Sequence, residues 1–363
     1  MNIPPAFSTY LDLVRATCAI AVVFHHYSNR IVRTFPFPDV GQEAVMVFFV
    51  LSGFVIAHVA RHSENDPIVF ATKRLARIYP VAIVGVVLSY LLYALCSPLD
   101  PGLYAEGVGS HPWWSEVLLT LGFVNQTFWL PQAMPPANGP FWSLTCEIWF
   151  YVLAVFMFFA PLRWALFAIL FAVPALGPRI MLLFPVWLVG VCAERMCDRP
   201  RIPRSVAAAL GLASLMLAVK LWTSDARADW RVPAAIVDAW RLGRTSDFVY
   251  YNVLGVLVGV HLFAAHNFFT GPLVWPARLR RYIRHGAETS FSLYALHFPI
   301  LYAFRSSMPN EPFAYFYPLA TITLVLLFGK PIENLRGPVY RLLRMLAARA
   351  RLFTPRPALD PVD

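Results

Sequence analysis

Runs of apolar residues about as long as a bilayer is thick recur along the whole chain. An α-helix needs about 20 apolar residues to cross the hydrocarbon core, and ten segments come close to that length. They cover residues 9–28, 41–60, 78–97, 142–160, 163–177, 179–193, 205–222, 247–266, 288–306 and 313–330. The pattern predicts an all-α integral membrane protein, a polytopic bundle of about ten transmembrane helices.

A further segment, 114–128, is a weaker candidate, and the charged residues argue against its crossing the membrane. Short loops rich in Lys and Arg stay on the cytoplasmic side. If 114–128 does not cross, loop 98–141, which has no Lys or Arg, lies outside. The basic segments then share the other side: 61–77, 194–204, 278–284 and the tail after Lys330. We therefore expect a multi-pass membrane protein with cytoplasmic N- and C-termini.

The composition agrees with a membrane protein and excludes other classes. Of the 363 residues, 58% are hydrophobic and 14% are charged, against about 45–50% and 25% in soluble domains. The net charge of +10 is explained by the basic loops, so no nucleic-acid partner is expected. The five cysteines include no CxxC pair, which favours neither a disulfide framework nor a zinc site. The first basic residue is Arg15, so no removable signal peptide is expected.

The end of the chain differs from the rest. Residues 336–353 alternate arginines with apolar residues at helical spacing, which is typical of a helix lying on anionic membrane lipids. We expect a membrane domain over 1–335, and over 336–363 a basic amphipathic helix with a disordered cytoplasmic tail.

The first predicted span contains Asp12, Arg15, His25 and His26, and ionisable groups in hydrocarbon are costly unless paired or hydrated. Arg15 and His26 are 11 residues apart, so at about 100° per residue they share a helix face, separated by about 16 Å along the axis. Asp12 lies on that face one turn before Arg15. A buried Asp–Arg pair that orders the bundle and a functional polar stripe both fit this pattern.

Other spans contain further candidates. Arg74 and Arg77, one turn apart, suit phosphate oxygens but also the usual basic anchoring at the cytoplasmic side. Glu147 lies within a span and requires a partner or a cavity; Arg15 and His26 are its expected partners. His297 is mid-span, and a structural role is as plausible as a catalytic one.

Two short motifs in the second span indicate packing rather than chemistry. Ser52-Gly53 lacks the GxSxG frame of a hydrolase nucleophile, so it favours close packing of small residues between helices. His58 and His62 have the i, i+4 spacing of a zinc pair, but the sequence HVARH lacks the glutamate of HExxH. No metal is expected.

Five motifs in one order resemble the acyltransferase family 3 of integral membrane proteins, which acylate bacterial O-antigen and exopolysaccharide. They are YLDLVRA…FHH, VFFVLSGFVI, KRLARIYP, FWSLTCEIWFYVL and FSLYALHFPIL, spread over nearly the whole chain. The family's Arg-x10-His pattern matches Arg15 and His26, which makes His25 a bystander. Its RxxR pattern matches Arg74 and Arg77, and its Trp-Ser-Leu…Glu pattern matches Trp142, Ser143 and Glu147.

Two departures limit the resemblance. The usual Gly-Val-Asp before the second motif is Ala44-Val45-Met46 here, and the late Glu-Pro motif is altered around Glu333. Any role of that aspartate is therefore missing, and Glu333 is not carried over.

The resemblance implies transfer of an acyl group, by family default acetyl, from cytoplasmic acyl-CoA to a hydroxyl of a saccharide or glycolipid. His26 would act as general base or become transiently acylated. Arg15 would neutralise the thioester oxyanion or polarise its carbonyl, and Glu147 would orient His26 or stabilise its imidazolium. Arg74 and Arg77 would bind CoA phosphates, with Asp12, Trp142, Ser143 and His297 in support. A transporter or flippase for a lipid-linked saccharide is the alternative, although no inverted repeat is found. The sequence does not determine the oligomeric state.

Overall fold

The computed structural model describes residues 3–32, 35–105, 111–199, 201–271, 273–308 and 313–349, and every regular element within them is a helix. The all-α prediction is confirmed. The α-helices are α1 (Pro5–His26), α2 (Gly41–His62), α3 (Pro67–Cys96), α4 (Pro101–Ala105), α5 (Trp113–Leu121), α6 (Trp142–Phe159), α7 (Leu162–Leu176), α8 (Pro178–Met181), α9 (Phe184–Met196), α10 (Arg204–Thr223), α11 (Ala226–Asp229), α12 (Ala234–Ala239), α13 (Phe248–Phe268), α14 (Ala277–Ser307), α15 (Tyr317–Asn334) and α16 (Arg336–Arg349). Shorter turns are the π-helix η1 (Tyr27–Ile31) and the 3-10 helices η2 (Gly139–Phe141), η3 (Gly243–Asp247) and η4 (Phe313–Phe316).

Six helical segments of the described chain are long and apolar enough to cross a membrane, judged by length and composition. They are Pro5–Ile31, Gly41–His62, Pro67–Cys96, Gly139–Phe159, Arg204–Thr223 and Gly243–Phe268. The predicted total of about ten spans is not confirmed by this criterion and stays a prediction. The predicted span 179–193 is two helices, because α8 ends at Met181 and α9 begins at Phe184. Helix α5 has nine residues and is about 14 Å long, too short to cross a core of about 30 Å.

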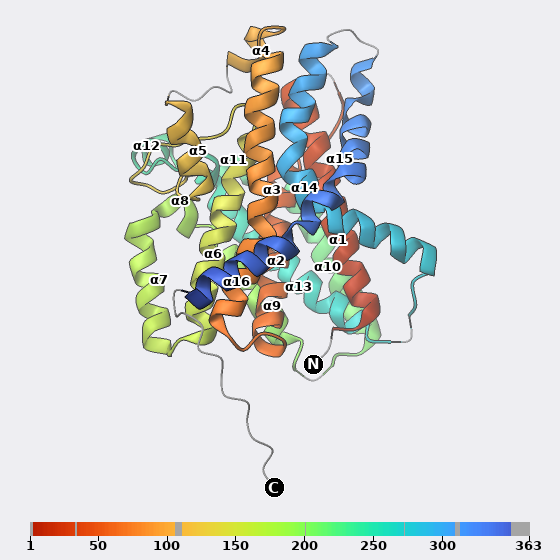
Figure 1. Cartoon of the computed structure of the whole chain (residues 1–363). Coiled ribbons are helices and arrows are strands. Elements are labelled where there is room, and N and C mark those ends of the chain that lie inside the picture. Colours follow the sequence, from red (N-terminus) through yellow and green to blue (C-terminus); the bar gives the residue numbers. More distant parts are fainter. Residues whose placement is uncertain are drawn as a thin grey trace.

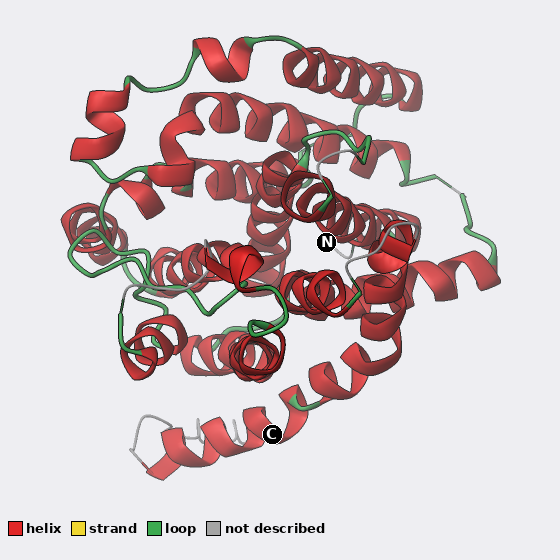
Figure 2. Ribbon diagram, turned by 90° about the horizontal axis from the view of Figure 1, so that it is seen from above, coloured by secondary structure: helices red, strands yellow, loops and turns green. Residues whose placement is uncertain are grey.

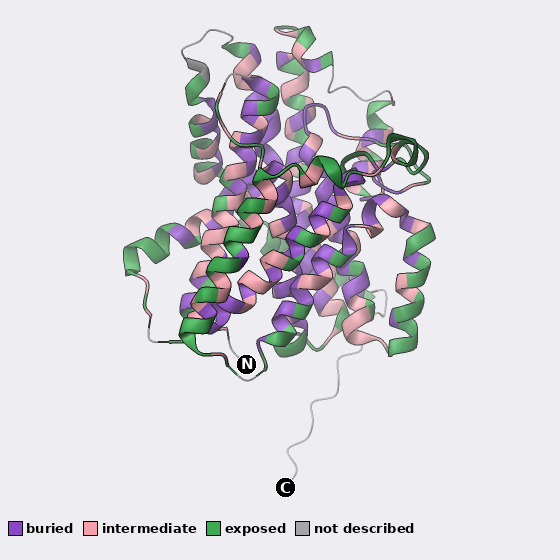
Figure 3. Ribbon diagram, turned by 180° about the vertical axis from the view of Figure 1, so that it is seen from behind, coloured by how far each residue is buried: buried purple, intermediate pink, exposed green. Residues whose placement is uncertain are grey.

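The long helices form one bundle around a buried centre. Helix α14 packs against α1, α3 and α15 on one side of the bundle, and α2 packs against α1, α6, α9 and α13 on the other (Figures 1 and 2). Buried residues follow the inner faces of these helices, and exposed residues follow the outer faces (Figure 3). Large exposed side chains such as Leu212, Leu215 and Met216 on α10 are apolar, as expected of a surface that faces lipid.

Helices α2 and α9 approach each other closely at two glycines. A Cβ atom at Gly53 would lie 2.0 Å from the carbonyl oxygen of Trp187, and a Cβ atom at Gly190 would lie 2.0 Å from that of Val50. Only glycine allows backbones to come this near. The predicted packing role of the Ser52-Gly53 motif is confirmed.

The predicted helix at the end of the chain is present as α16, which lies across α3 (Figure 1). Its side chains are mostly exposed, with Ala347 buried. The predicted disordered tail lies outside the described residues, and the cytoplasmic location of the two termini stays a prediction, as does the division into 1–335 and 336–363.

Candidate active site

A cavity with a mostly apolar lining lies in the centre of the bundle between α1, α2, α3, α6 and α14. Its volume is about 70 Å³, and its polar lining includes Arg15, Arg77, Ser143, Glu147 and Tyr294. Four residues singled out in the sequence, Arg15, Arg77, Ser143 and Glu147, thus come together here.

A wider, charged vestibule adjoins this cavity. Its volume is about 380 Å³, and Arg15 and Arg77 line both spaces. The vestibule has five cationic and three acidic side chains: Arg15, Arg77, Arg284, Lys330, Arg336, Asp12, Glu288 and Glu333. Because Asp12 belongs to the first half of α1, the vestibule lies toward the end of the bundle at which α1 begins (Figure 1).

The guanidinium groups of Arg15 and Arg77 make no close contact with a carboxylate, although Glu147 and Glu333 lie near enough to act on Arg77 electrostatically. Within the described chain neither makes a hydrogen bond, and the one ion pair is a long contact of 3.9 Å between Arg15 Nη1 and Asp12 Oδ1. A charged group kept in a bundle without a close partner needs water or an anion. The two arginines therefore form a ready site for an anionic group at the junction of vestibule and cavity.

Arg74, the other residue of the RxxR motif, lies elsewhere. Its Nη2 donates to Glu64 Oε2 at 2.9 Å, and its guanidinium carbon lies 5.0 Å from the centre of the Phe70 ring. Lys73 binds the second oxygen of the same carboxylate at 2.8 Å. An anion at Arg74 would have to replace Glu64, so the predicted phosphate contact of Arg74 stays a prediction that this arrangement does not favour.

Glu147 faces the cavity from α6 without touching His26. Its Oε1 accepts hydrogen bonds from Tyr151 and, at 3.4 Å, from Ser52. Ser143, one turn earlier on α6, contacts Tyr294 instead, with 2.6 Å between the two hydroxyl oxygens. No Glu147–His26 contact is present among the described residues, whereas Arg15, the other expected partner, lines the same cavity as Glu147.

His26 is paired with His297, a partner from helix α14. The Nε2 of His297 lies 3.2 Å from the Nδ1 of His26. His297 Nδ1 lies within 3.0 Å of the carbonyl oxygens of Leu293 and Tyr294, and His26 Nδ1 lies 2.9 Å from that of Val22. A ring nitrogen beside a carbonyl oxygen must be the donor, so both Nδ1 atoms are protonated and both Nε2 atoms have a lone pair.

The tautomer leaves His26 ready to accept a proton. His26 Nδ1–H points to Val22 and His297, while His26 Nε2 has no hydrogen bond in the described chain. The π-helix η1 begins at the next residue, Tyr27, and such irregular turns are frequent at functional sites. His25 is engaged differently, since its Nδ1 lies 2.9 Å from Asp39 Oδ1. That geometry agrees with its expected role as a bystander.

Arg15 and His26 both lie on α1, as predicted, but they belong to different parts of the site. Arg15 lines the cavity and the vestibule, whereas His26 packs on His297 and Phe298. Their separation of about 16 Å along α1 prevents both side chains from contacting one carbonyl group. The supporting residue Trp142 is buried against Phe49, with 6.3 Å between ring centres.

Glu333 was not carried over from the family resemblance, but its side chain lines the vestibule. Its Oε1 accepts hydrogen bonds of 3.1 Å from the backbone nitrogen and the hydroxyl of Ser292. Tyr294 lines the cavity and also lies beside His297, with 6.2 Å between ring centres, so it connects the cavity to the imidazole pair. The clustering of hydroxyls around His297 in the sequence ETSFSLYALHF was the available signal.

Comparison with known proteins identifies the family of this chain. The model of an acyltransferase domain family matches residues 8–329, which include the cavity, most of the vestibule and the imidazole pair. The chain belongs to the acyltransferase 3 family. The predicted resemblance to this family is confirmed.

One named relative agrees with the family. Acyltransferase MdmB of Streptomyces mycarofaciens is 37% identical over 115 residues, which is 31% of this chain and 27% of the relative. The match therefore spans about a quarter of the relative's length. No solved structure matches this chain.

Proposed function

We propose that this acyltransferase takes an acyl group from acyl-CoA at the vestibule and transfers it to a hydroxyl group at the opposite end of the bundle. The observation that supports this most directly is the pair of guanidinium groups, Arg15 and Arg77, at the junction of vestibule and cavity. CoA combines phosphate groups with a long, thin arm that ends in the thiol. A cationic vestibule that adjoins a mostly apolar cavity suits both parts.

In this proposal the vestibule faces the cytoplasm and holds the phosphates. Arg77, Arg284 and Arg336 offer guanidinium forks, which bind phosphate with two parallel hydrogen bonds. Arg15 binds the donor at the entrance of the cavity, a role that replaces its expected contact with the thioester oxyanion. Glu147, held by Tyr151 and Ser52, sets the shape and charge of the cavity.

The chemical step takes place at His26. Its Nε2 accepts the proton of the acceptor hydroxyl, and the oxygen attacks the thioester carbonyl carbon. Collapse of the tetrahedral intermediate expels the CoA thiolate, which receives the proton from the imidazolium. His297 stabilises that imidazolium by accepting a hydrogen bond from His26 Nδ1. A route through acyl-His26 uses the same atoms in two steps, and label retained on the protein distinguishes the two.

We place the acceptor at a cleft of about 690 Å³ between α8, α12 and the segment before η2, lined by Trp129, Gln132, Arg179, Asp238 and Arg241. Trp129 is 70% exposed, and its flat apolar face with planar polar groups around it suits the alternating C–H and O–H groups of a saccharide. Gly243 lines the cleft, and the next residue, Arg244, lies close enough to His26 to act on it electrostatically. The cleft therefore lies next to a residue that acts on the proposed base, His26.

Acetyl as the acyl group, a cell-envelope glycan or glycolipid as acceptor and the bacterial inner membrane as location complete the proposal. The membership in an acyltransferase family supports transfer chemistry over the alternative of a transporter. No metal and no nucleic acid take part in this reaction scheme.

The test uses the full-length protein in lipid nanodiscs with acetyl-CoA and a lipid extract of the source cells as acceptor. Release of the CoA thiol is measured for wild type, His26→Gln and His285→Gln, a control outside the site. General-base catalysis contributes at least about 100-fold, so His26→Gln should lose that factor while His285→Gln matches wild type. Equal rates for wild type and His26→Gln would overturn the assignment of His26, and no release by wild type would overturn acetyl-CoA as donor.

A further inference from the structure

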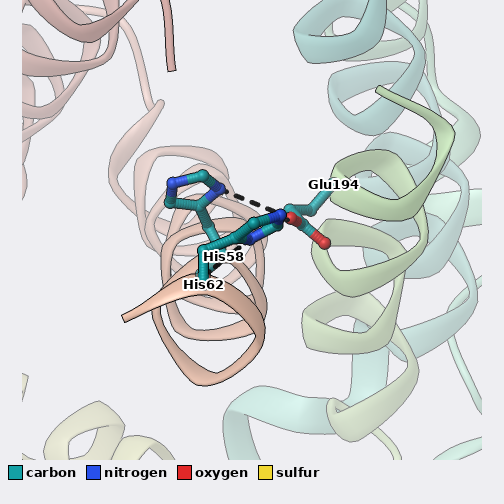
Figure 4. A group of neighbouring side chains, drawn as sticks. All are labelled: His58, His62 and Glu194. Carbon is teal, nitrogen blue, oxygen red and sulfur yellow. Dashed lines mark hydrogen bonds and ion pairs between the residues drawn. The ribbon is translucent and has the colours of Figure 1, made fainter. Parts of the chain in front are cut away.

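Three potential metal ligands meet where α2 and α9 end, away from the cavity and the vestibule. His58 and His62 occupy one face of the last turns of α2, and Glu194 of α9 faces them (Figure 4). Glu194 Oε1 lies 3.4 Å from His58 Nδ1 and 3.7 Å from His62 Nδ1. One ligand atom from each residue lies within 4.8 Å of the other two.

These distances are close to those that a tetrahedral zinc site requires. Zinc binds histidine nitrogen and carboxylate oxygen at about 2.0–2.2 Å, which places neighbouring ligand atoms roughly 3.3–3.6 Å apart. Two imidazoles and one carboxylate are also a common zinc ligand set with one position left open. The site needs no large rearrangement to accept the ion.

The surroundings of Glu194 favour this use of the carboxylate. Its side chain is 3% exposed, and Arg61 Nη1 donates to its other oxygen, Oε2, at 2.6 Å. Arg61 also binds Asp198, at 2.5 Å, so its charge is shared between two carboxylates. Because Oε2 is occupied, Oε1 is directed at the imidazoles, and metal-binding carboxylates are usually held by such an outer hydrogen bond.

Both histidines remain accessible to an ion from solution. The side chains of His58 and His62 are 17% and 23% exposed, and their rings stack with 4.6 Å between centres. His62 Nδ1 also contacts the carbonyl oxygen of His58 at 3.0 Å, a bond that metal binding at Nδ1 would replace.

We propose that His58, His62 and Glu194 bind a divalent transition-metal ion of the zinc class, which ties the end of α2 to α9. These two helices already touch at Gly53 and Gly190, so the ion would fix the same pair at a second point, near their ends. The proposal departs from the sequence-based expectation of no metal. The HVARH motif lacks a third ligand in sequence, and Glu194 supplies it from 132 residues beyond His62 in the fold.

The test measures metal content and is independent of acyl transfer. Full-length protein without a histidine tag is stripped with a chelator, dialysed against micromolar ZnCl2 and analysed for zinc per chain. Wild type and the control His285→Ala should retain one zinc ion per chain. His62→Ala, which removes an exposed side chain, should bind zinc at least about 10-fold more weakly, and His58→Ala should do the same.

Co²⁺ in place of Zn²⁺ gives a second readout, because tetrahedral cobalt absorbs visible light. The proposal expects this absorption in wild type and its loss in His62→Ala. Wild type that retains no more zinc than His62→Ala would overturn the proposal, and the three residues would then be an ion-pair cluster alone. A wild-type zinc site that survives both histidine substitutions would place the metal elsewhere and overturn it equally.

Discussion

Replacing Arg77 with Gln tests the donor side of the site, because Arg77 belongs to both cavities and has no hydrogen-bond partner within the described chain. A hydrogen bond to a charged group contributes about 1.5–3 kcal/mol, and 1.4 kcal/mol is about tenfold in affinity. Arg77→Gln should therefore weaken acetyl-CoA binding by roughly 10- to 150-fold. Arg77→Lys keeps the charge but not the planar fork, so its loss should be smaller.

Isothermal titration of acetyl-CoA into the protein in nanodiscs measures these affinities directly. Lys73→Gln is the matched control, since Lys73 lies on the same helix, binds Glu64 and lines neither space. Lys73→Gln should bind acetyl-CoA as tightly as wild type does. Dephosphorylated variants of the ligand should bind more weakly, and to the same extent, to both proteins. If Arg77→Gln binds acetyl-CoA within twofold of wild type, the vestibule does not hold the donor phosphates.

Three further predictions concern the imidazole pair, the helix contact and the acceptor cleft. His297→Phe removes the acceptor for His26 Nδ1–H and should lower kcat about tenfold or more with an unchanged Kd for acetyl-CoA; an unchanged kcat would contradict the role of His297. Gly190→Ala brings a Cβ atom to 2.0 Å from a backbone oxygen and should cost at least about 1–3 kcal/mol of stability, whereas the control Gly211→Ala, 3.6 Å from its nearest neighbour, should be neutral or stabilising; equal Tm values would refute the close contact. Trp129→Ala should raise KM for the acceptor several-fold and leave the Kd for acetyl-CoA unchanged; a weakened donor affinity would argue against a separate acceptor cleft.

Much of the fold follows from the sequence because apolar length and helical periodicity are local properties. Each predicted span except 179–193, which is two helices, corresponds mainly to one helix. Arg15 and His26 lie on one face of α1 because the helical repeat fixes their relative direction. The break between α8 and α9 was missed because the apolar run after Arg179 was taken as one segment. Pro185, in the first turn of α9, was the local signal of a helix start.

The partners in the site were beyond the sequence because they join distant parts of the chain. His26 and His297 are 271 positions apart, and no local pattern relates them. Arg74 and Arg77 are one helical turn apart, yet Arg74 binds Glu64 whereas Arg77 lines the cavity. Glu194 likewise became a candidate metal ligand only when α9 was placed against α2.

The most direct test of the account is an experimental structure of the His26→Gln variant with acetyl-CoA bound in lipid nanodiscs. The account predicts phosphate density in the vestibule beside Arg77, the arm of CoA in the cavity along Glu147, and the acetyl group directed at the side chain that replaces His26. Density for the phosphates at another surface, or an acetyl group far from the imidazole pair, would contradict it.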